Sequence, residues 1–139
     1  MTATVGDIVA RHMAREGPLL PILNDVQAAF GHVSEDAIRT IADLLNLTRA
    51  EVHGVVSFYH DYHDRPEPRP VIKLCRAEAC QARGGDALAA WAAAEARERI
   101  AIEPVYCLGL CSVGPAAMIG DRVYGRLDTE TLHQLTAAL

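Results

Sequence analysis

Four cysteines in two close pairs constrain the fold of this 139-residue chain more than any other feature of its sequence. Cys75 and Cys80 enclose four residues (CRAEAC), Cys107 and Cys111 enclose three (CLGLC), and twenty-six residues separate the pairs. The opening MTATVGDIVARH lacks the basic-then-apolar pattern of an export signal, and no stretch reaches the roughly 18 apolar residues of a membrane span. We therefore expect a cytoplasmic protein without a membrane span. A reducing cytosol opposes structural disulfides, so the cysteines predict metal binding or redox chemistry.

Residues 1–69 carry the signals of a small all-helical bundle followed by a linker. Apolar residues recur at helical spacing in four segments, at about 5–13, 18–30, 34–45 and 48–59. Gly31 suits a left-handed C-cap, Ser34 suits an N-cap, and Thr48 with Glu51 forms the capping-box pattern. The segment His60–Pro70 (HDYHDRPEPRP) is charged and contains three prolines, so it cannot continue a helix. We place the domain boundary there.

Residues 70–139 alternate between strand and helix signals. We expect strands at 71–74 and 100–105, a hairpin of strands at 116–119 and 123–124, and helices capped by Asp86 and Asp128. The first two strands, joined through a helix, should run parallel, and the last two antiparallel. Leu88 and Trp91 are expected to face the sheet. The predicted fold class is α/β: a thioredoxin-like mixed sheet with helices, preceded by the small all-helical bundle.

Each cysteine pair follows the end of a predicted strand, so both pairs should lie in loops at one edge of the sheet. A two-iron, two-sulfide cluster needs this arrangement, because each iron takes two thiolates and two bridging sulfides. Gly109 and Gly114 leave room for hydrogen-bond donors to sulfur. Arg76 either adds a positive charge near the cluster or is an ordinary exposed arginine. An apolar shield around the cluster is expected from Leu108, Leu110 and Val113.

Three other uses of these cysteines compete with the two-iron cluster. A structural zinc also accepts four thiolates, although the four-residue gap is at the edge of its usual ligand spacing. A thioredoxin-type redox enzyme needs a C-x-x-C pair, which neither motif supplies. Four free core cysteines fit poorly with two close pairs at strand ends. The spacing therefore predicts a metal more firmly than it identifies which metal.

Other features exclude or leave open further functions. The 13 basic and 18 acidic residues give a net charge of −5, which is no footprint for nucleic-acid binding. Rieske-type ligation by histidine is disfavoured because four cysteines already complete the cluster. We interpret the three histidines near the end of the fourth helix as surface or capping residues: His53, His60 and His63.

The stretches EVHGVVSFYHDYH and CLGLCSVGPAAMIGDRVYGRL resemble a known family over nearly the whole chain. This family comprises the thioredoxin-like 2Fe-2S ferredoxins that serve as small subunits beside a flavin subunit. They occur in respiratory complex I, in NAD-reducing hydrogenases and in NAD-dependent molybdenum formate dehydrogenases. The segment CRAEACQARGG is more similar to the gamma subunit of the formate dehydrogenases than to the complex I subunit.

The resemblance implies that Cys75 and Cys80 bind one iron of a 2Fe-2S cluster and that Cys107 and Cys111 bind the other. It also implies a partner with FMN and an NAD site, and a large molybdopterin subunit in which formate is oxidised. This chain has no Gly-rich dinucleotide fingerprint and no evident catalytic set, so we expect it to carry electrons without substrate chemistry. The alternatives are a subunit of complex I or of a hydrogenase, a free-standing ferredoxin, and a metal-stapled adaptor without redox function.

Overall fold

The structure, a computed structural model, describes residues 3–139. The chain divides into two compact units, Met1–Glu67 and Pro68–Leu139, each of which is described by itself. None of the helices formed by the described residues is long and apolar enough to cross a membrane.

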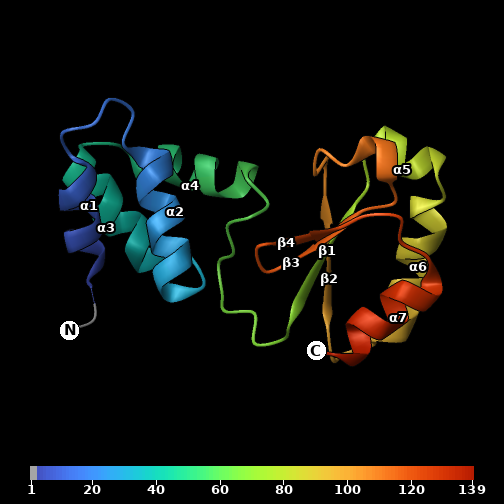
Figure 1. Cartoon of the computed structure of the whole chain (residues 1–139). Helices are drawn as coiled ribbons and strands as arrows, with labels where there is room; N and C mark the ends of the chain where they lie inside the picture. The colour runs from blue at the N-terminus through green and yellow to red at the C-terminus, as the bar shows by residue number, and fades with distance from the viewer. Residues whose placement is uncertain (1–2) are drawn as a thin grey trace. The chain divides into compact units, whose positions relative to one another are not determined.

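The first unit consists of four helices, α1 (Val5–His12), α2 (Leu19–Phe30), α3 (Glu35–Leu45) and α4 (Arg49–Phe58) (Figure 1). The predicted caps are confirmed. Ser34 accepts a hydrogen bond from the third backbone N–H of α3, Thr48 and Glu51 form a reciprocal capping box, and Gly31 has a left-handed φ of 74°. The amphipathic faces meet in an apolar core whose fully buried members include Ile22, Leu23, Ile41 and Val52.

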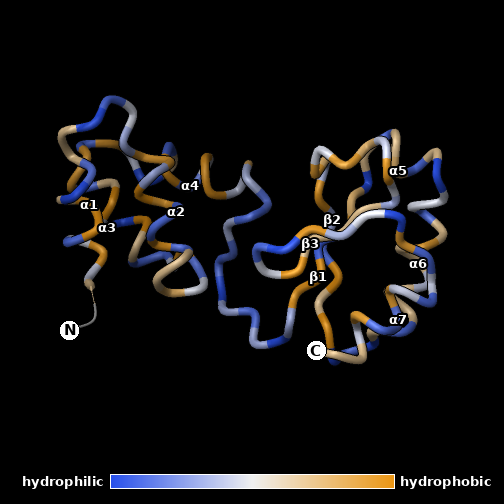
Figure 2. Tube along the Cα trace, in the orientation of Figure 1, coloured by the Kyte–Doolittle hydropathy of each residue, from blue (hydrophilic) through white to orange (hydrophobic). Residues whose placement is uncertain are grey.

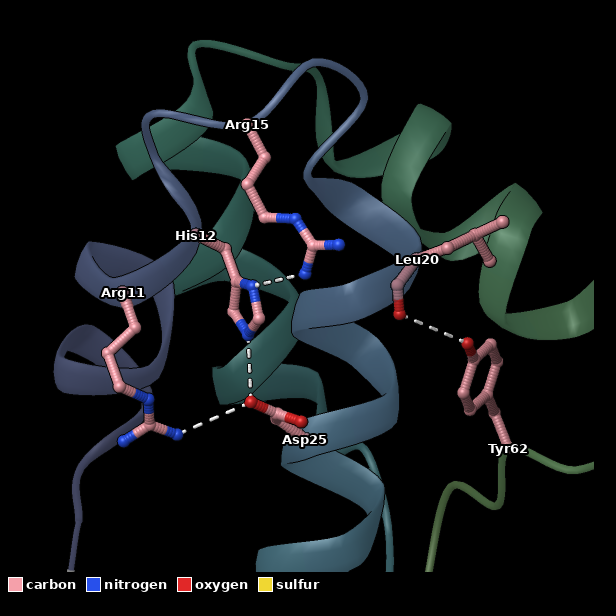
Figure 3. Close-up of polar contacts among 6 residues, drawn as sticks. All are labelled: Arg11, His12, Arg15, Leu20, Asp25 and Tyr62. Atoms are coloured by element: carbon pink, nitrogen blue, oxygen red, sulfur yellow. Dashed lines mark hydrogen bonds and ion pairs between the residues drawn. The ribbon is translucent and has the colours of Figure 1, made fainter.

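Polar contacts join the first two helices and the segment after α4. Asp25 of α2 lies 2.8 Å from the His12 ring and 3.4 Å from the Arg11 guanidinium, both of α1 (Figure 3). The Tyr62 hydroxyl donates a hydrogen bond of 2.7 Å to the side chain of Asn24. The beginning of the segment after α4 is thereby attached to α2.

Between α4 and the first strand of the second unit, residues 59–70, all of which the structure describes, form no helix or strand. This segment is mostly hydrophilic (Figure 2). Its three prolines prevent it from continuing the helix, as the sequence predicts.

The second unit is built on a four-stranded mixed sheet in the order β2-β1-β3-β4. The strands are β1 (Val71–Cys75), β2 (Ala101–Val105), β3 (Ala117–Ile119) and β4 (Arg122–Tyr124). β1 pairs parallel with β2 and antiparallel with β3, and β3 pairs antiparallel with β4, which confirms the predicted topology. Only Gly120 and Asp121 form the hairpin turn, because Arg122 already pairs with Ile119.

The helices of this unit are α5 (Glu78–Ala82), α6 (Gly85–Ala96) and α7 (Thr129–Ala137), with a short 3₁₀ turn, η1 (Cys111–Val113). α6 and α7 lie on the same side of the sheet (Figure 1). Leu88 is buried against Ile72 and Leu132 in the core, as predicted. Trp91 is only half-buried at the edge of this core, where its ring makes an edge contact with the ring of His133.

One local prediction for this unit is wrong, and one helix was not predicted. Asp86 does not cap α6, which begins at Gly85 after Gly84 in a left-handed conformation. Its carboxylate binds the Arg76 guanidinium instead, at 2.9 Å. The sequence also gives no sign of α5, because a five-residue helix between two cysteines is too short for a helical period to be recognised.

Candidate metal centre

The four cysteines lie at the ends of β1 and β2 and in the short elements that follow. Cys75 is the last residue of β1 and Cys80 lies within α5. Cys107 lies in the loop after β2, and Cys111 begins η1. The expectation that all four lie in loops is therefore wrong for Cys75 and Cys80, although all four follow the predicted strand ends. Each is a free cysteine.

The sheet and α5 together position the first pair. The backbone N–H of Cys75 donates to the Ala116 carbonyl at 2.9 Å, and that of Arg76 donates to the Val105 carbonyl at 2.8 Å. The end of β1 is thus held from both sides. α5 then turns the chain back, so that the Cys80 thiol interacts with the Cys75 sulfur. Both residues are buried, with exposed fractions of 4% and 2%.

A tight loop positions the second pair. Cys107 and Gly109 both have a left-handed backbone, with φ of 76° and 77°. The loop brings the Cys107 and Cys111 sulfurs to 3.7 Å, and the Gly109 N–H donates to the Cys107 sulfur at 3.4 Å. In contrast to the first pair, Cys107 and Cys111 are exposed.

Backbone donors from both loops surround the Cys75 sulfur. Burial is the largest influence and acts to raise the pKa of Cys75. The backbone N–H groups of Ala77, Cys107 and Leu108 and the Cys80 thiol together outweigh burial and lower this pKa below its ordinary value. Leu108 and Leu110 of the second cysteine loop also pack on the cluster formed by Cys75, Cys80 and Ala116, so that loop faces the first pair. The two pairs therefore meet.

The pKa values of Cys80 and Cys111 are raised. Burial, followed by the hydrogen bond with Cys75, raises the pKa of Cys80. The hydrogen bond with Cys107 and repulsion from its charge raise the pKa of Cys111, which also interacts electrostatically with Cys75. Neighbouring sulfurs thus oppose the ionisation of Cys80 and Cys111, and positive charge among the cysteines would favour it.

Two glycines allow the chain to pack tightly around Cys80. A Cβ at Gly114 would lie 3.0 Å from the Cys80 sulfur, and one at Gly85 would lie 2.7 Å from the Cys80 carbonyl oxygen. The sequence predicts that Gly114 leaves room for hydrogen-bond donors to sulfur, but the Cys80 sulfur itself occupies this room. The role of Gly85 was missed, and the Gly84-Gly85 dipeptide was its only signal in the sequence. The peptide bond between Gly114 and Pro115 is cis.

An apolar surface adjoins the sulfurs. Leu108 and Leu110 are half-buried and pack on the small cluster formed by Cys75, Cys80 and Ala116. Arg76 does not present a free positive charge, because Asp86 accepts hydrogen bonds from its guanidinium at 2.9 and 3.1 Å. The charge of Arg76 is therefore largely offset before it can act on the sulfurs.

The donor set matches a binuclear cluster in its chemistry. A two-iron cluster takes its protein ligands in pairs, two thiolates on each iron. Two facing cysteine pairs, with backbone N–H groups directed at sulfur, are what such a cluster needs. The residues present therefore fit a 2Fe-2S cluster.

The three histidines that we interpret from the sequence as surface or capping residues belong to the first, helical unit. His53, His60 and His63 line a cavity of about 460 Å³ together with Tyr59 and Tyr62. His53 and His60 are exposed, whereas His63 is half-buried and its backbone N–H donates to the Gln27 side chain at 3.0 Å. Their interpretation as surface or capping residues stays a prediction.

Comparison with known proteins places these features in a family context. The profile of the family described as thioredoxin-like [2Fe-2S] ferredoxin matches residues 5–139. The chain is 27% identical to the NADP-reducing hydrogenase subunit HndA of Solidesulfovibrio fructosivorans, over 88% of this chain and 77% of that protein. It is 32% identical to a subunit of the NADH-quinone oxidoreductase of Escherichia coli (strain K12), over 81% of this chain and 74% of that protein.

Other matches extend well beyond this chain. It spans 56% of the corresponding NADH-quinone oxidoreductase protein of Mycobacterium tuberculosis (strain ATCC 25618 / H37Rv), at 27% identity over 96% of its own length. A crystal structure of an NAD+-reducing [NiFe]-hydrogenase in the air-oxidised state is similar in fold, with a TM-score of 0.66 and 24% identity. That similarity covers 83% of this chain and 22% of the hydrogenase chain.

Proposed function

This chain belongs to the thioredoxin-like [2Fe-2S] ferredoxin family, and from this membership we propose that it is the electron-transfer subunit of a multisubunit NAD-linked oxidoreductase. The observation that carries the proposal is the meeting of the two cysteine loops: Leu108 and Leu110 of the second loop pack on the buried cluster that contains Cys75 and Cys80. A 2Fe-2S cluster, when bound, accepts and returns one electron at a time.

We assign Cys75 and Cys80 to one iron and Cys107 and Cys111 to the other. Other residues of the chain position these ligands or stabilise their negative charge. The hydrogen bonds at the end of β1 fix Cys75, and the close contact of Gly114 limits the movement of the Cys80 sulfur. The N–H groups of Ala77, Cys107 and Leu108 stabilise negative charge on sulfur.

The exposed pair indicates the side through which electrons pass. Cys75 and Cys80 are buried, whereas Cys107 and Cys111 reach the surface, beside Tyr106 with 65% of its area exposed. A redox partner that docks on the Cys107–Cys111 loop would approach the cluster most closely there. We expect this partner to carry FMN and to bind NAD, as the family resemblance implies.

We further propose a cytoplasmic NAD-dependent formate dehydrogenase as the parent enzyme, with a large subunit that holds molybdopterin. The support is the segment CRAEACQARGG around the first cysteine pair, whose resemblance is to the gamma subunit of those enzymes. Affinity purification of the native complex tests this step. Recovery of a molybdopterin-containing subunit is the expected result, whereas a nickel-containing subunit would assign the chain to a hydrogenase.

Metal and sulfide analysis tests the cluster itself. We expect two iron atoms and two acid-labile sulfides per anaerobically purified chain, with a paramagnetic signal after reduction. Zinc without sulfide would overturn the proposal and would instead support the adaptor function. Reversible one-electron reduction separates the two functions independently, because an adaptor needs no redox cycle.

Serine variants test the ligand assignment. Cys75→Ser and Cys107→Ser each replace one thiolate by a weaker ligand, so each should lose or strongly alter the visible absorbance of the cluster. The helical circular dichroism of the first unit should be retained, since its core contains no cysteine. Wild-type absorbance in both variants would contradict the assignment.

A further inference from the structure

We propose that Cys107 and Cys111 form an internal disulfide when the cluster is absent, and that this bond prevents cluster insertion until a thiol reductant opens it. The second cysteine loop would then be a redox-controlled gate on cluster assembly. This inference rests on the ligand assignment proposed above, but it concerns the protein before it carries the cluster.

The first argument is the distance between the two sulfurs. The Sγ atoms of Cys107 and Cys111 are 3.7 Å apart, and a disulfide bond requires about 2.05 Å. The loop, in which Cys107 and Gly109 adopt left-handed conformations, already holds the two sulfurs within hydrogen-bonding range of each other. Bond formation requires the two side chains to close the remaining gap. The first pair also interacts, so distance alone does not distinguish the two pairs.

The two cysteine pairs differ in their exposure to solvent. Thiol–disulfide exchange requires that an external disulfide reach the attacking sulfur. Cys107 and Cys111 are exposed, whereas Cys75 and Cys80 are only 4% and 2% exposed beneath Leu108, Leu110 and Ala116. An oxidant can therefore reach the second pair while the fold protects the first. The burial of the first pair makes the predicted oxidation specific.

The chemistry balances with a low-molecular-weight disulfide such as oxidised glutathione as the electron acceptor. One cysteine thiolate attacks the small disulfide, forms a mixed disulfide and releases one glutathione thiolate. The thiolate of the other cysteine then attacks the protein sulfur of this mixed disulfide and releases the second glutathione. Two protein thiols lose two electrons and two protons in total, and one glutathione disulfide becomes two glutathione thiols.

The consequence for the cluster follows from the assigned ligands. Only the thiolate form of cysteine binds a metal, so a Cys107–Cys111 disulfide removes both protein ligands of one iron. The buried pair remains able to bind the other iron but cannot hold a two-iron cluster alone. Reduction by a thiol restores both ligands at once.

Peptide mass spectrometry of the full-length apoprotein tests the disulfide. Trypsin places Cys107 and Cys111 in one peptide, Ile100–Arg122, and places Cys75 and Cys80 in two others, Leu74–Arg76 and Ala77–Arg83. After anaerobic iron removal and exposure to oxidised glutathione, Ile100–Arg122 should lose the mass of two hydrogen atoms. The other two peptides should remain separate and accept a thiol-alkylating reagent after unfolding.

Two controls isolate the role of the fold. The same treatment in urea exposes both pairs, which have similar spacing, so a linked Cys75–Cys80 species should now appear. Cys111→Ser should instead accumulate a stable glutathione adduct on Cys107, and Cys80→Ser should still form the internal bond. Four free thiols after oxidation of the folded chain, or a folded chain that links Cys75 to Cys80, would overturn the proposal.

Cluster reconstitution tests the gate. Oxidised apoprotein supplied with ferrous iron and sulfide without added thiol should recover its visible band more slowly than reduced apoprotein, because sulfide opens the disulfide only gradually, and dithiothreitol should abolish the difference. Equal rates of cluster uptake by the oxidised and reduced apoproteins would refute the gate. This result differs from a failure of the proposed function, in which reduced apoprotein would take up no 2Fe-2S cluster either.

Discussion

At the scale of single residues, Cys80 experiences the tightest packing around the proposed cluster. Its thiol contacts Cys75, its carbonyl lies where a side chain at Gly85 would be, and its sulfur lies against Gly114. Gly114 has an ordinary negative φ, so contact with the sulfur, and not the backbone conformation, is what demands glycine here. The backbone and the sulfur of Cys80, a proposed ligand, thus occupy space that side chains at these two positions would need.

Gly114→Ala tests this contact. The added methyl group would lie 3.0 Å from the Cys80 sulfur, so the sulfur or the loop must shift by a few tenths of an ångström. We expect an altered visible spectrum and faster loss of iron to a chelator. Gly120→Ala is the matched control, because Gly120 has a φ of 60° and open space around its Cβ position. That variant should lose about 1 kcal/mol of stability while its cluster spectrum stays unchanged.

Asp25 links α1 and α2 through its contacts with His12 and Arg11. The hydrogen bond with His12 is the main cause that lowers the pKa of Asp25 below its ordinary value of 3.8. A carboxyl with a lowered pKa stabilises the fold fully above the unfolded value, and this contribution is lost as the pH falls through the folded value. The contribution of Asp25 should therefore disappear below pH 3.8.

Asp25→Asn should make the stability of the first unit less dependent on pH in this acidic range. Urea unfolding followed by helical circular dichroism at a series of pH values measures the slope. The pH dependence of stability should decrease only in part, because the capping carboxylates of Asp7 and Glu51 also have lowered pKa values. An acid slope identical to that of the wild type would show that the contact between His12 and Asp25 contributes nothing in solution.

At the scale of elements, α4 begins with a complete capping box. Thr48 and Glu51 exchange side-chain and backbone hydrogen bonds of 2.8 and 3.2 Å. This box satisfies two N–H groups that would otherwise lack partners at the helix start. It also fixes where α4 begins, and hence which residues, Val52 and Val56, face the core.

Thr48→Ala should reduce the free energy of unfolding by about 1 kcal/mol, because it removes the cap from the N-terminus of α4. Thr40→Ala is a suitable control, since the Thr40 hydroxyl only donates to the Asp36 carbonyl within α3. The control should be neutral or slightly stabilising in the same chemical denaturation assay. Equal losses in the two variants would contradict the capping role.

At the scale of the whole molecule, the division into two units carries a functional consequence. The first unit, Met1–Glu67, has a continuous apolar core without a cysteine, and the second unit holds all four proposed ligands. Metal binding contributes folding free energy only to the part of the chain that supplies the ligands. We therefore propose that the units unfold independently and respond differently to metal removal.

Differential scanning calorimetry before and after iron removal should show this difference. One transition, assigned to the second unit, should move to lower temperature without the cluster. The transition temperature of the helical unit should not change. Circular dichroism of a sample matched in pH and salt can monitor this transition separately. A single transition that moves as a whole would show that the two units are thermodynamically coupled.

Local chemistry made much of this protein predictable from its sequence. Ser34, Thr48 and Asp128 cap the helices that the sequence assigns to them, since a cap requires only the adjacent backbone. The predicted cap at Asp86 is wrong because its carboxylate binds a more distant group, the Arg76 guanidinium, which lies ten residues earlier in the chain. Sequence spacing could not reveal that ion pair.

The ligand pairs themselves follow from spacing, because residues four or five apart at strand ends remain neighbours in almost any fold. Three features depended on contacts between distant segments. These are the approach of the Cys107 and Leu108 N–H groups to Cys75, the crowding of Cys80 by Gly114, and the burial of only one pair. The sequence by itself determined most of the helices and strands and the candidate ligands, since these depend on periodicity, local capping and close spacing along the chain. Only the tertiary structure decided which thiols are shielded, because burial arises from packing between segments that are far apart in the chain.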